Sequence, residues 1–294
     1  MFADACQRAM SYTRPVVVST RRHDGSVGSE CGTFIVINRE GWIITAGHMF
    51  DSMVKYQSDV KKIREIEEIN ASRTQEPGAP DPTIKIDPAL ITNHSFWWGW
   101  DGVRLTKAYV NRQIDFAVGK LEPFDPDWVR EYPVLLDPIH ARIGRSLCRM
   151  GYPFLNIQAT FDESMNAFRI PKIPVEEAVF PCDGIYTRTL HRGKSKEGGY
   201  DMTYIETSTP GLKGQSGGPI FDSHGNIYGM QVITNHLPLG FHPMVEYDGR
   251  KVVENQFLNV GVGVHVRTIR DILDARGVDY TSEGDESGFR IIDG

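Results

Sequence analysis

Most of the chain alternates between short apolar runs and turn residues. The runs are rich in valine, isoleucine, phenylalanine, tyrosine and threonine, which favour β-strands. Turn signals such as Asn38–Gly41, Asp222–Asn226 and Asp248–Gly249 separate many of them. Strands are therefore predicted at Pro15–Ser19, Thr33–Asn38, Trp42–Thr45, Phe116–Leu121, Ser146–Met150, Thr203–Thr207, Pro219–Phe221, Ile227–Thr234 and Val260–Val266.

The order of these runs indicates the fold class. Strands and helices do not alternate regularly, which argues against a parallel, doubly wound sheet. Many short strands joined by glycine-rich turns favour antiparallel barrels or sandwiches. We therefore predict an all-β protein.

Two segments break the strand pattern. Asp51–Ser72 carries apolar residues at helical spacing with charged residues between them, so it predicts a long amphipathic helix. Arg267–Arg276 has an apolar face and is followed by Gly277, a common helix stop. A proline-rich loop, Thr74–Thr83, follows the first helix, and the tail Thr281–Gly294 is polar.

Composition narrows the classes of function. The chain has 294 residues, 40% hydrophobic and 24% charged, as in a soluble globular protein with room for two domains. Its net charge of −6 is unlike the basic surface of a general nucleic-acid binder, so we expect no nucleic-acid partner. No apolar run approaches the ~20 residues of a spanning helix, so we expect no membrane segment.

The cysteines and the first residues bear on the compartment. Cys6, Cys31, Cys148 and Cys182 lie far apart, and no CxxC or Cys/His cluster predicts a metal site or a cofactor. The opening sequence, MFADACQRAM, lacks the basic start and apolar stretch of a signal peptide. We therefore expect a cytoplasmic protein with reduced thiols.

Three local motifs carry candidate chemistry. His48 follows a strand in the sequence TAGH, Asp115 opens the apolar strand DFAV, and Ser216 stands in the glycine-rich segment GQSGGP. A serine hydroxyl becomes a nucleophile when a base lies within hydrogen-bond reach and a third group orients that base. Histidine suits the base and a carboxylate suits the orienting group. Each motif alone has an ordinary structural explanation, but the three in this order favour nucleophilic catalysis.

With these motifs the chain resembles the chymotrypsin-fold (trypsin-like) serine proteases, and most of all the bacterial Deg/HtrA type. TAGH at 45–48 is similar to the family's TAAH or TNNH, Ile114–Ala117 to its aspartate motif, and GQSGGP at 214–219 to its serine motif. His140–Pro153 resembles the segment that opens the second barrel, and Val260–Leu273 the closing strand and helix. The resemblance covers residues 14–276.

The resemblance implies two six-stranded antiparallel β-barrels with the active site between them. The domains would be an N-terminal barrel at 14–125 with a helical insertion at 51–100, a C-terminal barrel at 140–266, and a helix and tail at 267–294. It also implies roles for residues. His48 would be the general base and acid, Asp115 would orient it, and Ser216 would attack the peptide carbonyl. The backbone N–H groups of Gly214 and Ser216 would form the oxyanion hole, with a protein or peptide as substrate.

Several positions depart from the family pattern. Gln215 precedes the serine where secreted digestive enzymes have an aspartate that pairs with a new N-terminus, so activation by N-terminal cleavage is not expected. Two family disulfides are not expected. Cys31 aligns with one half of the pair that flanks the histidine, but the partner position is Met49, and a second family cysteine is replaced by Leu212. From the short stretch after the closing helix we expect no PDZ domain, unlike in the full Deg/HtrA proteins.

The resemblance also places a substrate pocket. Pro210 takes the position of the floor carboxylate of trypsin, so selection of lysine or arginine is not expected. A small or medium apolar residue before the scissile bond is the expectation. The pocket residues would be Pro210, Val232, Ile233, Thr234 and Gly261.

Two further segments have open interpretations. The aromatic cluster Phe96–Trp100 could be a docking surface or a membrane-interface anchor, but packing of the insertion against the first barrel is favoured. The basic segment Arg188–Lys196 is expected to be a solvated loop that could order the serine loop. We expect the insertion to lie beside the cleft.

Three functions compete at this point. The leading hypothesis is a serine endopeptidase. The first alternative is a catalytically silent or partner-gated module of the same fold, which adds a protein activator as a candidate partner. The second is an unrelated β-rich interaction protein in which the motifs occur by chance.

Overall fold

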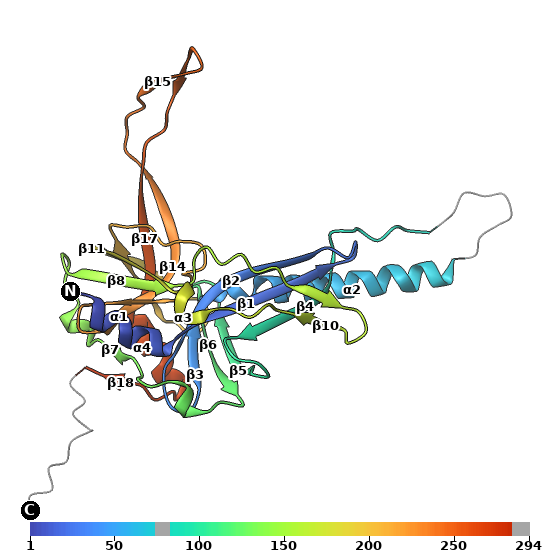
Figure 1. Ribbon diagram of the computed structural model, residues 1–294, viewed down its shortest axis with the longest axis horizontal. Helices are drawn as coiled ribbons and strands as arrows, with labels where there is room; N and C mark the ends of the chain where they lie inside the picture. The colour runs from blue at the N-terminus through green and yellow to red at the C-terminus, as the bar shows by residue number, and fades with distance from the viewer. Residues whose placement is uncertain (74–82, 284–294) are drawn as a thin grey trace, which may run out of the picture.

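Two antiparallel sheets build the protein, as Figure 1 shows for the computed structural model, which describes residues 1–73 and 83–283. The first sheet has six strands in the order β4-β1-β2-β3-β6-β5. Its edge strands, β4 and β5, do not pair in the part of the chain described, so the sheet forms a half-barrel. The strands are β1 (Thr13–Arg22), β2 (Val27–Val36), β3 (Trp42–Thr45), β4 (Ile91–Trp98), β5 (Arg104–Asn111) and β6 (Phe116–Glu122).

The second sheet closes on itself. Six antiparallel strands run in the order β13-β8-β11-β12-β17-β14, and β14 pairs back to β13 to complete a ring. Two short strands, β7 (Val134–Leu135) and β18 (Thr281–Ser282), extend it in parallel from β14. The ring strands are β8 (Ser146–Gly151), β11 (Phe180–Lys194), β12 (Asp201–Thr207), β13 (Pro219–Phe221), β14 (Asn226–Pro238) and β17 (Phe257–His265).

The remaining elements are short, except for one helix. Two small hairpins pair β9 with β10 and β15 with β16. These elements are α1 (Ala3–Tyr12), η1 (Gly47–Phe50), α2 (Asp51–Ser72), η2 (Pro126–Trp128), η3 (Pro138–His140), β9 (Thr160–Asp162), β10 (Ala167–Arg169), α3 (Val175–Ala178), β15 (Met244–Tyr247), β16 (Arg250–Val253) and α4 (Val266–Arg276). Among the described residues no helix is long and apolar enough to cross a membrane.

The predicted all-β class is confirmed, and one detail is corrected. Every strand predicted from the apolar runs lies within or overlaps an observed strand, and both predicted helices are present. The two predicted closed barrels are one ring and one half-barrel. The predicted insertion at 51–100 also contains β4, which pairs with β1 and is part of the first sheet. The exact domain boundaries stay predictions.

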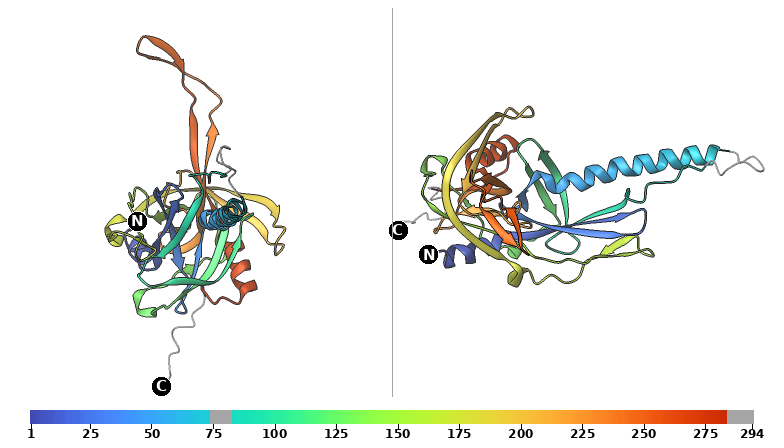
Figure 2. Two further views of the ribbon diagram at one scale, coloured as in Figure 1. Left: turned by 90° about the vertical axis from the view of Figure 1, so that its right-hand side faces the viewer. Right: turned by 90° about the horizontal axis from the view of Figure 1, so that it is seen from above.

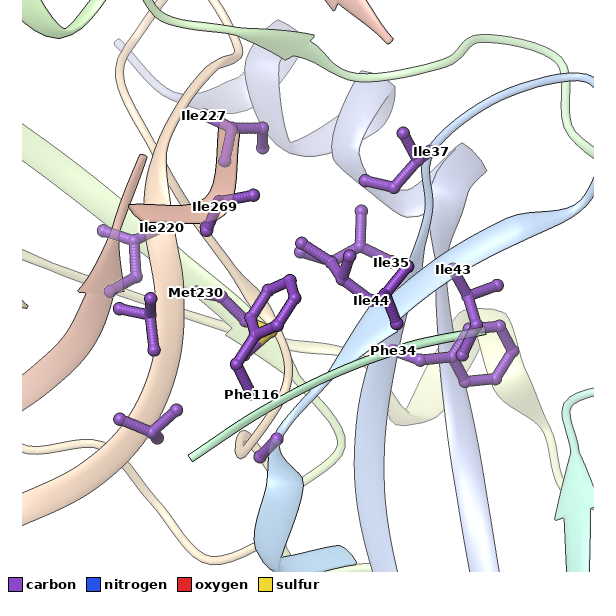
Figure 3. Close-up of a cluster of buried hydrophobic side chains, with 14 of the residues drawn as sticks. Phe34, Ile35, Ile37, Ile43, Ile44, Phe116, Ile220, Ile227, Met230 and Ile269 are labelled. Atoms are coloured by element: carbon purple, nitrogen blue, oxygen red, sulfur yellow. The ribbon is translucent and has the colours of Figure 1, made fainter. Parts of the chain in front are cut away.

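A single hydrophobic core joins the two sheets. Ile35, Ile44 and Phe116 come from the first sheet, and Ile220 and Met230 come from the second; all are fully buried. Figure 3 shows these side chains gathered between the strands. Burial of apolar surface therefore fixes one sheet against the other, which positions any site built from both.

The aromatic cluster belongs to this packing, as favoured above. Trp98 is buried and makes an edge-to-face contact with Phe34 at 5.6 Å between ring centroids. Trp100 stacks on Trp128 at 5.2 Å. The cluster therefore anchors β4 in the first sheet.

Two elements project from the body in different directions (Figures 1 and 2). One is α2, whose Asp59 is buried and accepts a 2.9 Å hydrogen bond from the backbone N–H of Ile91 on β4. The other is the arm formed by the ends of β14 and β17 and the β15–β16 hairpin. Its apolar side chains Met244 and Tyr247 are largely exposed.

Candidate active site

His48 lies in η1, directly after β3. Its backbone N–H donates to Asp115 Oδ1 at 2.7 Å, and its ring Nδ1 lies 2.8 Å from Asp115 Oδ2. Because a carboxylate can only accept, Nδ1 carries the hydrogen in this pair. In the neutral ring Nε2 is then left as an acceptor, the state required of a general base.

Asp115 stands in a tight turn that opens β6. Its φ is +64°, in the left-handed region that aspartate tolerates better than most residues. Asn111 builds the turn, since its Oδ1 accepts hydrogen bonds from the backbone N–H groups of Gln113 and Ile114. Tyr204, from the second sheet, donates to the Ile114 carbonyl at 3.1 Å. The turn that carries the carboxylate is thus held from both sheets.

Ser216 lies in the glycine-rich loop between β12 and β13. Gly217 has a φ of +86°, and a Cβ there would lie 2.0 Å from the Thr33 carbonyl oxygen. Gly214 has a φ of +100°, and a Cβ there would lie 2.3 Å from the Tyr152 carbonyl oxygen. Only glycine fits these two positions, so the sequence GQSGGP is required by the close packing of this loop.

Thr33, on β2, holds the serine loop to the first sheet. Its backbone N–H donates to the Ser216 carbonyl at 2.8 Å, and its hydroxyl donates to the Gly214 carbonyl at 2.7 Å. Thr45, three residues before His48, donates its hydroxyl to the Thr33 carbonyl at 2.7 Å. Sequence reasoning placed Thr33 in a strand but did not predict this role, because the contact joins residues distant in sequence.

His48 and Ser216 border the same pocket, which has a volume of about 260 Å³. Gly214 and Lys213 line it from the serine loop, and Ser52 lines it from the first turn of α2. The start of the helical insertion therefore lies beside the candidate site, as expected. Asp115 contacts His48 but does not line the pocket.

The candidate oxyanion hole is formed by backbone groups. Within the described residues, no hydrogen bond uses the N–H of Gly214 or of Ser216 as donor. Both amides are therefore uncommitted in the loop that borders the pocket. Two such donors are able to bind a developing negative charge.

Gln215 stabilises this loop through hydrogen bonds, at the position where secreted digestive enzymes form an ion pair with a new N-terminus. Its side chain is fully buried, its Oε1 accepts from the Leu212 N–H at 3.0 Å, and its Nε2 donates to the Phe180 carbonyl at 3.1 Å. A second contact runs from the Gln215 N–H to the Leu212 carbonyl at 2.9 Å. The neutral amide is thus satisfied by its own chain and leaves no partner role for a cleaved N-terminus.

Val232, Thr234 and Gly261, three of the predicted pocket residues, lie on β14 and β17, and the substrate pocket itself stays a prediction. Val232 brings its carbonyl to 3.5 Å from Ser216 Oγ. Thr234 pairs with Gly261 across β14 and β17 and donates its hydroxyl to the Gly211 carbonyl at 2.6 Å. Pro210 is half-buried next to Gly211, whereas the side chain of Ile233 is exposed and turned away from the core.

Arg149, on β8, was missed by the sequence analysis. It is only 1% exposed, and its guanidinium occupies the space that a Cβ at Gly261 would need. Burial lowers the pKa of Arg149 to about 10, so it stays charged at neutral pH. The only signal in the sequence is an arginine within the apolar strand SLCRMG, which reads equally well as an outward-facing residue.

The basic segment Arg188–Lys196 is largely strand, which corrects the expected loop. Residues up to Lys194 belong to β11, and Arg188 forms a two-pronged ion pair with buried Glu206, both contacts at 2.8 Å. The following turn reaches the first sheet, where the Lys196 N–H donates to Gln113 Oε1 at 2.7 Å. It therefore touches the turn that carries Asp115.

All four cysteines are free: Cys148 is buried, and the other three are half-buried. Within residues 1–73 and 83–283 no group of acidic residues, histidines and cysteines could hold a metal ion.

The comparisons with known proteins assign the family. Residues 32–230 match the trypsin-like peptidase domain, so the chain belongs to that family. The match removes the hypothesis of an unrelated protein with chance motifs and confirms the resemblance seen in the sequence. No curated protein matches the chain.

Two solved structures that are similar to the chain are described as proteases. The HtrA-type protease AlgW with a tripeptide shares 14% identity and a TM-score of 0.48, over 94% of this chain and 63% of that chain. The Rv3671c protease from M. tuberculosis in its active form shares 12% identity and a TM-score of 0.48, over 94% of this chain and 86% of that chain. This chain therefore corresponds to less than two thirds of the AlgW chain.

Proposed function

We propose that the protein is a serine endopeptidase that cleaves protein substrates through an acyl-enzyme. The observation that carries the proposal is the pairing of His48 with Asp115 at the edge of a pocket that Ser216 also borders. In this assignment His48 is the general base and acid, Asp115 orients it, and Ser216 is the nucleophile.

The geometry supports a two-stage reaction. His48 Nε2 takes the hydroxyl proton as Ser216 Oγ bonds to the substrate carbonyl carbon, and the oxyanion accepts from the Gly214 and Ser216 amides. The same proton then passes to the leaving nitrogen as the peptide bond breaks, which leaves an acyl-enzyme. Water repeats the attack, His48 removes its proton, and that proton returns to Ser216 Oγ. Each oxyanion donor is worth ~3–4 kcal/mol in such reactions.

A partner-gated version of this function is favoured by one contact. The hydrogen bond from the Thr234 hydroxyl to the Gly211 carbonyl joins β14 to the segment next to Pro210, two sides of the predicted substrate pocket. An activator protein that separates these two segments would open the predicted pocket to a substrate side chain. In this version the catalytic residues keep their roles and a protein activator is an additional partner.

Labelling with a fluorophosphonate probe tests the proposal. Such probes react with an activated serine, so the wild-type protein is expected to be labelled and Ser216→Ala to be silent. Ser223→Ala, in an exposed turn, is the matched control and should label like wild type. Labelling that appears only after addition of a cellular extract would select the partner-gated version. Labelling that survives in Ser216→Ala would refute the assignment.

We further propose a reducing compartment, the cytoplasm, on the basis of the thiols. Cys6 and Cys148 lie with their sulfur atoms 3.9 Å apart and without a covalent bond. An oxidising compartment would favour closure of such a pair. Cell fractionation with the natural protein tests this; recovery outside the cytoplasm with a Cys6–Cys148 disulfide would contradict it.

A further inference from the structure

Arg149 is a buried cation without a carboxylate partner. Its Nη1 donates to the Thr209 carbonyl at 2.7 Å, and its Nη2 contacts the Thr207 hydroxyl. Its Nε finds no hydrogen-bond partner, and no carboxylate of the described residues lies within 4.0 Å of it. An unpaired buried charge destabilises the folded state, so its presence here indicates a functional role.

The guanidinium lies against Gly261, a residue of the predicted substrate pocket. A Cβ at Gly261 would lie 2.2 Å from Nη1, so glycine there leaves the room that the guanidinium fills. The Thr209 carbonyl, which accepts from Arg149, also accepts from the Gly261 N–H at 2.8 Å. Gly261 pairs with Thr234, two residues beyond the Val232 carbonyl that contacts Ser216 Oγ. A series of contacts thus connects the strand beside the nucleophile with the cation.

The residues around this part of the predicted pocket are polar. Thr207, Thr209 and Thr234 contribute hydroxyls or carbonyls, and Gln231 is buried with its Oε1 unpartnered. A Cβ at Gly211 would lie 2.2 Å from Gln231 Nε2, so the glutamine side chain packs directly against Gly211. This lining does not suit the small apolar residue expected from the sequence. It suits a group that accepts hydrogen bonds and carries negative charge.

We propose that Arg149 selects substrates with an acidic residue, aspartate or glutamate, immediately before the scissile bond. The inference rests on the proposed function, because it gives the specificity of that same site. The substrate side chain enters between residues 209–212 and 231–234, displacing the contact between Thr234 and Gly211. Its carboxylate then accepts hydrogen bonds from the free N–H groups of Arg149, which completes a buried ion pair.

Peptides that differ at one position provide the test. Internally quenched peptides with Glu, Gln, Leu or Lys before the cleaved bond are offered to the wild-type protein, and their binding to Ser216→Ala is measured by calorimetry. The Glu peptide is expected to exceed its isosteric Gln counterpart by at least about 30-fold in kcat/KM and in affinity. Equal treatment of the Glu, Gln and Leu peptides by both proteins would overturn the inference.

Variants separate a direct role from a structural one. Arg149→Met should remove the preference for Glu over Gln, and Arg149→Lys should retain a reduced one, since lysine keeps the charge but loses the planar fork. Arg142→Met removes the same charge from an exposed position and should leave the preference unchanged. If Arg149→Met fails to fold, the Glu-to-Gln ratios of kcat/KM and affinity, measured for the wild type and for Arg149→Lys, still test the inference.

The cleavage and binding measurements together also distinguish a failure of this inference from a failure of the proposed function. Selective binding of the Glu peptide by Ser216→Ala, with no cleavage by wild type, would support the inference and contradict the endopeptidase. Cleavage of all peptides alike would support the endopeptidase and overturn the inference. Neither binding nor cleavage of any peptide would contradict both.

Discussion

The backbone N–H of Thr33 and the carbonyl of Ser216 are joined by a hydrogen bond of 2.8 Å, which ties the first sheet to the loop before β13. Thr33 lies on β2, and Thr45, three residues before His48, donates its hydroxyl to the Thr33 carbonyl from β3. The segments that carry the base and the nucleophile are therefore both hydrogen-bonded to Thr33. Such a shared anchor matters in a site built from two sheets, because small displacements of the catalytic groups lower the rate.

Replacement of Thr33 by valine should lower both stability and activity. The change keeps the shape but removes the hydroxyl that donates to the buried Gly214 carbonyl. The Gly214 carbonyl keeps a 3.2 Å hydrogen bond from the Tyr152 N–H, so the change removes one of its two partners. The loss of such a hydrogen bond costs about 0.5–1.5 kcal/mol, measurable as a decrease in the free energy of unfolding by urea titration. The rate of fluorophosphonate labelling should fall as well. Thr160→Val, at an exposed position, is the control; equal effects of the two changes would show that Thr33 has no special role.

Asp115→Asn should abolish most of the activity with little change in fold. An amide in place of the carboxylate can donate to Nδ1 and so favours the wrong tautomer of His48. A loss of about 10³–10⁴-fold in kcat is expected from this mechanism. Circular dichroism and thermal unfolding should remain close to wild type. An asparagine variant with unchanged kcat would remove Asp115 from the proposed triad.

Extension of the chain before Met1 should leave activity unchanged. The position that pairs with a new N-terminus in secreted digestive enzymes is Gln215 here, and its amide is satisfied by Leu212 and Phe180. By contrast, Gln215→Met should slow labelling of Ser216, because it leaves the Leu212 N–H and the Phe180 carbonyl without these partners. Activity that depends on a free residue at position 1 would contradict this account of the loop.

Acid should destabilise the protein through His265. This residue caps α4, with its Nδ1 accepting from the Arg267 N–H at 3.0 Å, and burial lowers its pKa to about 4. The unfolded chain, with an ordinary histidine pKa of about 6.5, binds the proton first. Stability is therefore fully present above pH ~6.5 and is lost as the pH falls toward 4, by about 2–3 kcal/mol.

Urea titrations between pH 7 and pH 4 check this slope. His265→Asn keeps a good helix cap without a titrating ring, so part of the acid sensitivity should disappear. The same slope in the variant and in the wild type would assign the acid sensitivity to other groups.

Sequence patterns predicted those parts of the fold that depend on local preferences. The helix Asp51–Ser72 begins and ends at the predicted residues, because its apolar stripe is long and regular. The helix Ala3–Tyr12 was missed, since only Ala5, Ala9 and Tyr12 are buried and two of these are small. The strand Phe180–Lys194 was missed because its sequence is largely polar and much of it is exposed.

The candidate site likewise contains residues that local sequence predicts and residues that it does not. His48, Asp115 and Ser216 stand in motifs whose residue types indicate their chemistry, and the structure brings His48 into contact with Asp115 and into a shared pocket with Ser216. Thr33 and Arg149 act through contacts between distant strands. Nothing in the local sequence states that a strand arginine turns inward, because tertiary packing decides its burial.

The most direct test of the central claim is a map of cleavage sites in a proteome digest. A cell lysate is incubated with wild-type protein, Ser216→Ala or His48→Ala, and new peptide N-termini are identified by mass spectrometry. The account predicts a set of new termini with the wild type that is absent with both variants. The same termini in all three digests would contradict the claim that Ser216, activated by His48, cleaves peptide bonds.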